Sequence, residues 1–546
     1  MNRRDLIDWS VLSGPRVSRR TLMQVAAASG ATAYAIRLAH VSARVTAGGK
    51  PRRLARRQDV QQGGELRWGY SIGQIPTLDP AQVNLGAVAG ELLANIFSGL
   101  VQFDEELGII PDLAEDWTVS EDGLEYTFNL RSGLTFHNGD PLTANDLIFT
   151  YERTTNPDVA SPHANKLELI EEITAPDDTT LVIRQSAPYA PFLGTACSRG
   201  PGRALLPISQ RAVEEMGDEQ FGIAPVGCGP FMIDPDTVEV GGGFELLAFE
   251  GWYGGRPPLD KVIVQLVAEP STLVSALEAG DVDMVDILPA TGYDQIAAVD
   301  DITIVEAAGT NWIGLAMNYN RPPWDNPDAR MAVAKAIDRE DLINTAFFGR
   351  ATPAIGPIAP AFGWVYQSED EAENPQAFNL DEARQLAEAA GLDGVQVNLI
   401  SNPDTRVQQA LRSQLSEIGL DIQIEQMQQN AYTERRNSGD YDMDVLGSVV
   451  DVDPDDNIWN FFHSEGPFNT YGYNNPDADA LCDAQREVGD QEERAQILQD
   501  LRLLVANDAA YAFLYHLPDV TAFYNYIQGY VPVPEQRYLE HLWIEQ

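Results

Sequence analysis

The stretch LRSGLTFHNGDPLTANDLIFTYER, residues 130–153, contains a turn signal followed by a helix start. Residues 138–141, Asn-Gly-Asp-Pro, favour a turn. Thr143 is a good N-cap residue, and Asp146 stands three positions later, which is close to the spacing of a capping box. Three apolar residues then follow at helical spacing: Leu147, Ile148 and Tyr151. We therefore predict an amphipathic helix that begins after Thr143.

His137 is the residue of this stretch that most resembles a catalytic group. No cysteine lies near it, and no second histidine stands at the spacing of a metal ligand. A histidine without a partner is more often structural than catalytic. We therefore expect the polar residues of this stretch to make turns and caps rather than an active site.

The chain of 546 residues is too long for one compact core, so we expect two to four domains. Hydrophobic residues make up 44% of it, which is ordinary for a globular protein and argues against disorder.

Charge is distributed unevenly along the chain. Residues 1–57 carry 12 Lys or Arg and 2 acids, whereas the remainder carries 24 basic residues and 80 acids. A body this acidic repels nucleic acid and anionic membranes, so we expect no nucleic-acid partner. The acid excess and the presence of only four lysines favour a halophilic protein. Biased codon usage with ordinary solubilising acids is the alternative.

The N-terminus predicts export. Arg19 and Arg20 precede an uncharged run at 25–36 that is too short to span a bilayer. Small-residue sites follow at 41–47, and this order of parts is typical of a twin-arginine (Tat) signal. No cysteine precedes Cys197, so the sequence predicts no lipid anchor on an N-terminal cysteine. An exported protein can hold a disulfide, and Cys197 with Cys228 is one candidate pair.

The rest of the chain alternates strand and helix patterns, which predicts an α/β fold with mixed sheets. Residues 65–70 and 262–267 read as strands, and 271–279 as a helix ended by Gly280. Asn379 with Glu382 predicts a further capped helix.

An ordered series of short motifs resembles the extracytoplasmic solute-binding proteins of peptide, dipeptide, oligopeptide and nickel ABC importers, known as solute-binding protein family 5. The motifs are TLDP (77–80), PDLAEDW (111–117), FHNGD (136–140), GCGPF (227–231), LEAGDVD (277–283), AIDR (336–339) and DPD (453–455). The resemblance extends from about residue 64 to about residue 538.

The resemblance implies a two-lobed periplasmic-binding-protein fold with two crossing hinge strands and an extra small subdomain in the first lobe. Near 311–320 and 514–523 the chain would cross between the lobes. We predict these parts: a Tat signal region at 1–47, a polar basic linker at 48–62, lobe I at 63–100, 220–318 and 518–546, the extra subdomain at 101–219, and lobe II at 319–517.

In peptide-binding relatives an aspartate near the Asp-Pro motif holds the ligand amine. Here Asp451 and Asp453 are the candidates, although Asp451 is displaced by one position, and both could instead only build the turn. Dipeptide binders also use an Arg-Pro-Tyr stretch for the ligand carboxylate. The comparable place begins at Asn402 and has no arginine, so either Arg406 substitutes or the ligand lacks that carboxylate.

Further candidate ligand-binding residues are aromatic or polar side chains near the expected cleft; such aromatic residues more often belong to the core, and the asparagine could instead only form a loop. They are Trp312, Trp459, Asn469 and Tyr471.

We therefore predict a monomeric, extracytoplasmic component of an ABC importer that captures peptides in a cleft between its lobes and passes them to a membrane permease. It would have no catalytic residues, metal site or cofactor, and hinge motion would close it on the ligand. The same fold with an oligosaccharide or a metal chelate is the alternative. A secreted hydrolase is disfavoured, because the sequence contains neither Gly-x-Ser-x-Gly nor His-Glu-x-x-His.

Overall fold

The computed structural model describes residues 60–84, 86–239, 241–448 and 452–545. The chain divides into two units, Met1–Arg57 and Gln58–Gln546, and every described residue belongs to the second. The predicted signal region and most of the predicted linker therefore lie outside the described residues. No helix of the described part is long and apolar enough to cross a membrane.

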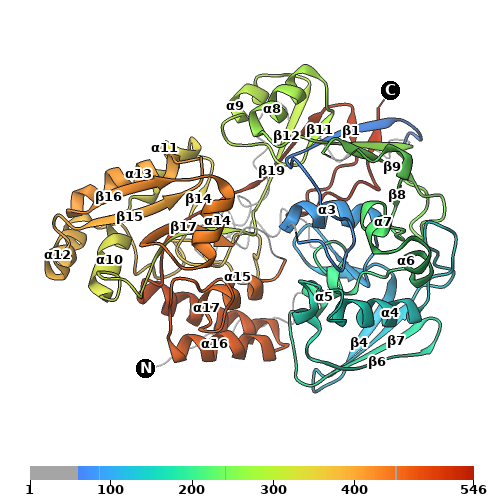
Figure 1. Cartoon of the computed structure of the whole chain (residues 1–546), viewed down its shortest axis with the longest axis horizontal. Helices are drawn as coiled ribbons and strands as arrows, with labels where there is room; N and C mark the ends of the chain where they lie inside the picture. The colour runs from blue at the N-terminus through green and yellow to red at the C-terminus, as the bar shows by residue number, and fades with distance from the viewer. Residues whose placement is uncertain (1–59, 85, 240, 449–451, 546) are drawn as a thin grey trace, which may run out of the picture. The chain divides into compact units, whose positions relative to one another are not determined.

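The first lobe is built on a seven-stranded mixed sheet (Figure 1). Its strands, in spatial order, are β12 (Ile302–Ala307), β19 (Asp519–Tyr524), β11 (Met284–Val285), β1 (Glu65–Tyr70), β10 (Lys261–Leu266), β9 (Gly243–Ala248) and β8 (Phe231–Ile233). β1 is parallel to β10 and β11, whereas the other pairs are antiparallel. The polar–apolar alternation of β1 buries Leu66, Trp68 and Tyr70 in the core of this lobe, as predicted.

Helices and short pairs of strands complete this lobe. They are α3 (Gly86–Ile96), α6 (Gln210–Met216), α7 (Asp218–Ile223), α8 (Pro270–Ala279), α9 (Tyr293–Ala297), β2 (Val101–Phe103) with β3 (Ile109–Pro111), and β20 (Ile527–Gln528) with β21 (Trp543–Ile544). Helix α8 ends at Gly280, which takes the left-handed conformation (φ +76°) that ends many helices.

A separate four-stranded antiparallel sheet, here called the small sheet, packs against residues 130–153. Its spatial order is β4 (Ala114–Val119), β5 (Glu125–Leu130), β7 (Thr180–Gln185) and β6 (Ile170–Asp177). Helices α4 (Ala144–Thr155) and α5 (Phe192–Ala196) pack against this sheet. The Thr143 N–H donates to the Asp146 carboxylate over 2.8 Å, which confirms the predicted helix start.

His137 has a structural position beside the small sheet. Its two ring nitrogens bond to backbone groups of Gly227 and Gly229, each over 3.1 Å. Burial lowers the pKa of His137 to about 4, so the ring is neutral at physiological pH. The structure thus agrees with a structural histidine.

The second lobe is built on a six-stranded mixed sheet. Its spatial order is β14 (Thr352–Pro353), β18 (Tyr511–His516), β13 (Trp312–Met317), β17 (Met443–Ser448), β15 (Gln396–Ser401) and β16 (Asp421–Gln426). Its helices are α10 (Pro327–Ala336), α11 (Arg339–Phe347), α12 (Leu380–Ala390), α13 (Arg406–Leu415), α14 (Gln429–Asn437), α15 (Pro454–Phe462), α16 (Pro476–Glu487) and α17 (Gln491–Asn507). The predicted cap of α12 is present, because the Asn379 side chain accepts from the Glu382 N–H.

The chain passes between the two large sheets at residues 308–311 and again at 517–518, after β12 and β18. Asn311 joins these two passages. Its amide donates to the Leu517 carbonyl over 2.8 Å, and its oxygen accepts from the Leu517 N–H over 2.7 Å. β13, which follows the first passage, belongs to the six-stranded sheet of the second lobe. The bounds of the lobes and of the extra subdomain that the sequence suggests stay a prediction.

Candidate ligand-binding site

The predicted Asp-Pro segment lies between β17 and α15 in the second lobe. Asp451 falls outside the described residues, so its role stays a prediction. Asp453 is the N-cap of α15, and its carboxylate accepts from the Asp455 N–H over 2.8 Å. Pro454 then occupies the first turn, where its missing N–H costs nothing. This accounts for the local sequence: the Asp-Pro pair starts the helix.

The carboxylate of Asp453 already has a charged partner. Arg494 of α17 donates to it through both terminal nitrogens, one of them over 2.8 Å, and both side chains are largely buried. An ammonium ligand at Asp453 would therefore have to compete with a bidentate guanidinium pair. This geometry favours a structural contribution from Asp453, while its role in binding stays a prediction.

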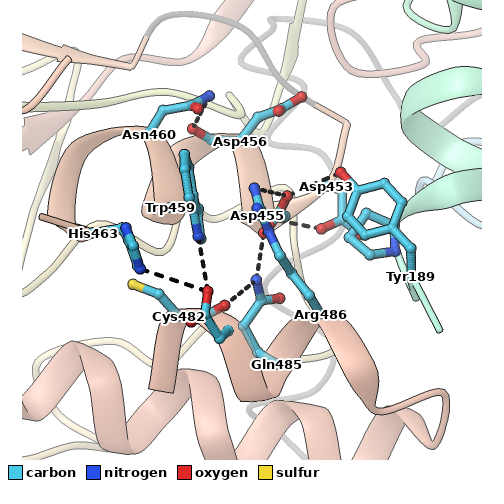
Figure 2. Close-up of polar contacts among 12 residues, drawn as sticks. Tyr189, Asp453, Asp455, Asp456, Trp459, Asn460, His463, Cys482, Gln485 and Arg486 are labelled. Atoms are coloured by element: carbon cyan, nitrogen blue, oxygen red, sulfur yellow. Dashed lines mark hydrogen bonds and ion pairs between the residues drawn. The ribbon is translucent and has the colours of Figure 1, made fainter. Parts of the chain in front are cut away.

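Asp455 is fully buried and connects the two lobes (Figure 2). Arg486 of α16 donates to its carboxylate over 2.7 and 2.9 Å. The Tyr189 hydroxyl, from the segment between β7 and α5, donates to it over 3.1 Å. Burial raises the pKa of Asp455, and the charge of Arg486 opposes this rise. A single carboxylate thus binds Tyr189 of the first lobe as well as Arg486 and Gln485 of the second.

Two further contacts join the small sheet's side of the first lobe to the second lobe. Lys166 makes an ion pair with Asp456 of α15 over 3.3 Å. The backbone N–H of Ala190 donates to the Arg486 carbonyl over 2.7 Å. At a different place Arg350, which follows α11, pairs with Asp294 of α9 over 2.6 Å. Among the described residues, these polar contacts therefore bridge the lobes at two separate places.

A cavity of about 510 Å³ lies where the first set of bridges meets α15, and Trp459 contributes to its wall. The ring of Trp459 stacks on His463 at 4.5 Å between centroids, and the Arg486 guanidinium lies 4.2 Å from the indole centroid. Its indole N–H donates to Asp483 over 3.1 Å. Trp459 thus reaches a cavity, whereas Trp312 and Tyr471 are fully buried.

The other candidate residues lie in the core or in turns. Trp312 is fully buried, packs on aromatic rings of α15 and β18, and donates to the Asn457 carbonyl over 3.2 Å. Tyr471 is also fully buried, and its hydroxyl donates to the Phe461 carbonyl over 2.8 Å. Asn469 and Asn402 bond to nearby backbone groups within their own loops. In this conformation their polar groups hold the protein scaffold.

Arg406 does not offer a free guanidinium in place of the missing arginine. It forms two bonds to Asp404, over 2.8 and 3.1 Å, and a third to the Ala346 carbonyl.

A second cavity, of about 240 Å³, lies within the second lobe, and the sequence did not predict it. Its walls come from β17, α14, α15 and the loop after α15: Arg436, Asn437, Leu446, Gly447, Ser448, Asp456, Asn460, Phe461, Phe468 and Thr470. A third cavity, of about 680 Å³, includes Asp453, Arg494 and Tyr189. Residues at α15 therefore contribute to three cavities, of which the 510 and 680 Å³ cavities combine residues of both lobes.

Two large mixed sheets, two passages between them and cavities at their boundary define the class of two-lobed binding proteins. The profile of "Bacterial extracellular solute-binding proteins, family 5 Middle" matches residues 108–469, which is more than half of the chain. The chain belongs to this family, and the resemblance inferred from the sequence is confirmed.

Three relatives illustrate the similarity. The oligopeptide-binding protein AppA of Bacillus subtilis is 25% identical over 502 residues, covering 87% of this chain and 90% of its own. The structure of DppA from Helicobacter pylori in complex with the peptide STSA has a TM-score of 0.76 and 26% identity, covering 89% of this chain and 99% of its own. AgaA from A. tumefaciens R10, in complex with agropinic acid, has a TM-score of 0.72 and 27% identity, covering 88% of this chain and 99% of its own.

Proposed function

We propose that this chain is the substrate-binding component of an ABC importer, which captures peptides between its lobes and delivers them to a membrane permease. The observation that carries this proposal is the pair of lobe-bridging contacts, Lys166 with Asp456 and Tyr189 with Asp455, beside a cavity at α15. Bridges that form when the lobes approach can stabilise a closed state around a ligand. Two relatives support a peptide as the ligand class: AppA, an oligopeptide-binding protein, and DppA, whose structure is a complex with the peptide STSA.

Asp451 is our proposed anchor for the peptide amine, with Trp459 as a stacking residue. We also propose that the protein is monomeric, is exported by the Tat route through its first 47 residues, and works in high salt without catalysing a reaction. The strongly acidic composition and the paired arginines at 19–20 support the halophile and Tat proposals. The domain bounds given above belong to the same proposal.

Native mass spectrometry of the exported protein tests the ligand class directly. We expect a passenger to be released on denaturation, with masses that match a ladder of peptides. A hexose ladder or a metal chelate would keep the transport class and replace the ligand. Turnover of peptide or glycoside substrates would refute the proposed function.

A further inference from the structure

Glu535 is a buried carboxyl that contacts both passages between the lobes. Its backbone N–H donates over 2.8 Å to the carboxylate of Asp519, the residue that directly follows the second passage. Its Oε1 accepts from the hydroxyl of Thr310, in the first passage, over 3.5 Å, and the Thr310 backbone bonds to the same carboxyl. Glu535 also takes a left-handed backbone conformation (φ +58°), which is uncommon for a residue with a side chain. A residue in such a conformation is held by its surroundings, so Glu535 has a fixed place between the two passages.

The charges around Glu535 do not balance among the described residues. Four carboxyls gather about the guanidinium of Arg537, and all five residues are at most 7% exposed; the carboxyls belong to Glu91, Asp286, Asp519 and Glu535. Arg537 donates to Glu91 and to Asp519, each over 2.9 Å. Four ionised carboxyls against one guanidinium would leave three negative charges uncompensated in the protein interior, which is strongly unfavourable. The cluster must therefore hold at least one proton.

Within this cluster, Glu535 combines a raised pKa with a bond to the first passage. Burial raises the pKa of Glu535 to about 8, so the carboxyl is mostly protonated at neutral pH. Burial also raises the pKa of Glu91 and of Asp286. These two carboxyls, however, bond at the end of β1: Glu91 accepts from the Tyr70 hydroxyl over 3.3 Å, and Asp286 accepts from the Ser71 hydroxyl over 2.6 Å.

Other titratable groups nearby keep one protonation state near neutral pH. His516 of β18 bonds through a ring nitrogen to the carbonyl of Asn311, over 2.8 Å, and burial lowers its pKa to about 4. Burial raises the pKa of Tyr530 to about 12 and that of Tyr70 well above its usual value. Glu535 is thus the group whose charge we expect to respond to the passages.

The first passage is also bonded to the helix that bridges the lobes. The Thr310 carbonyl accepts from the side-chain amide of Asn457, on α15, over 2.9 Å. The same helix carries Asp455 and Asp456, which bond to side chains of the first lobe. A hinge motion that moves α15 away from the first lobe must therefore change the position of Thr310 against Glu535.

We propose that Glu535 couples a proton to the hinge, so that the lobes close with this carboxyl protonated and open when it ionises. Opening lets water reach the carboxyl and stabilise its charged form, whereas the closed arrangement favours the neutral form. Closure therefore takes up a proton, and by linkage ligand binding weakens as pH rises through the window in which the two forms differ in charge. This inference rests on the hinge closure of the proposed function.

The test compares two forms of the full chain. The closed form carries Lys166→Cys and Asp456→Cys, joined by a bismaleimide cross-link in place of their ion pair, while the native cysteines stay buried. The opened form carries Lys166→Met and Arg350→Gln, which remove one bridge at each of the two places. Small-angle X-ray scattering measures the radius of gyration, which we expect to be smaller for the closed form.

The infrared band of protonated carboxyls, recorded against pH, then reports the proton on Glu535 in each form. Its contribution is the part of the band that Glu535→Gln loses and that Glu105→Gln, a control at an exposed glutamate, keeps. Thermal unfolding establishes that the variants are folded. If Glu535→Gln does not fold, Thr310→Val assigns the band instead, because loss of a hydrogen bond shifts the carbonyl frequency of Glu535.

We expect the Glu535 band to persist to about pH 8 in the closed form and to disappear at least about one pH unit lower in the opened form, a tenfold difference in proton affinity. Equal midpoints in two forms of different radius would overturn the proton coupling and leave the proposed function standing. Equal radii would refute closure between the lobes, and the proposed function would fail together with the coupling.

Discussion

Glu535 is a buried carboxyl beside the passages between the lobes, and replacing it with glutamine should change how stability depends on pH. Its side chain is 6% exposed. Its backbone N–H donates to the Asp519 carboxylate over 2.8 Å, and Thr310, in the first passage, contacts its Oε1. Burial first, and then repulsion by Asp519, raise the pKa of Glu535 from 4.5 to about 8, while the positive charge of Arg537 opposes the rise.

The sign of the effect follows from proton binding. Between about pH 4.5 and 8 the folded state keeps a proton on Glu535 that the unfolded state has released. The free energy of unfolding must therefore fall as pH rises through this window. The full difference corresponds to about 5 kcal/mol as an upper limit, because one pH unit is worth about 1.4 kcal/mol. Asp519 shares Arg537 with Glu91, so part of this energy is redistributed within the cluster.

The assay is denaturant unfolding of the wild type and of Glu535→Gln between pH 5 and 9 at fixed salt, followed by tryptophan fluorescence. We expect similar stabilities at pH 5, and a glutamine variant that is more stable than the wild type by several kcal/mol, up to about 5, at pH 9. Glu105→Gln, at an exposed glutamate, should follow the wild type throughout. Parallel curves for the wild type and Glu535→Gln would refute the reasoning.

Two other predictions concern the contacts between the lobes. Asn311→Ala removes both hydrogen bonds to Leu517 and leaves the Leu517 N–H and C=O without these partners. This should lower the free energy of unfolding by about 2–4 kcal/mol, whereas a loss below about 0.5 kcal/mol would contradict the prediction. Lys166→Met breaks the ion pair with Asp456, so bound ligand should dissociate a few-fold faster in stopped-flow measurements, because the closed state loses a bridge. Lys335→Met breaks a pair with Glu382 inside the second lobe and is the matched control; equal off-rates in the two variants would argue against closure through Lys166.

Local rules predicted much of the fold. The alternation at 65–70, the caps at Thr143 and Asn379, and the helix end at Gly280 all depend on neighbours within a few residues. The two-lobed arrangement required the ordered family motifs, because it depends on which distant strands pair.

The site was less predictable for the same physical reason. A buried aromatic such as Trp312 and a cavity aromatic such as Trp459 look alike in sequence, since burial depends on contacts with remote helices and strands. Arg435 and Arg436 are adjacent and chemically identical, yet one is paired and the other faces a cavity. Only the direction of each side chain in the folded lobe distinguishes them.

All three cysteines are free thiols in this structure, and all three are buried. Cys197 and Cys228 pack in the core beneath the small sheet, whereas Cys482 packs in the core of the second lobe. A thiol reagent can therefore react only when the surrounding core opens, and burial also keeps these sulfurs protonated. The three native cysteines are thus built-in labelling sites for local unfolding. If a thiol reagent is added under native conditions, the order in which the peptides that contain Cys197, Cys228 and Cys482 are modified would show which lobe opens first.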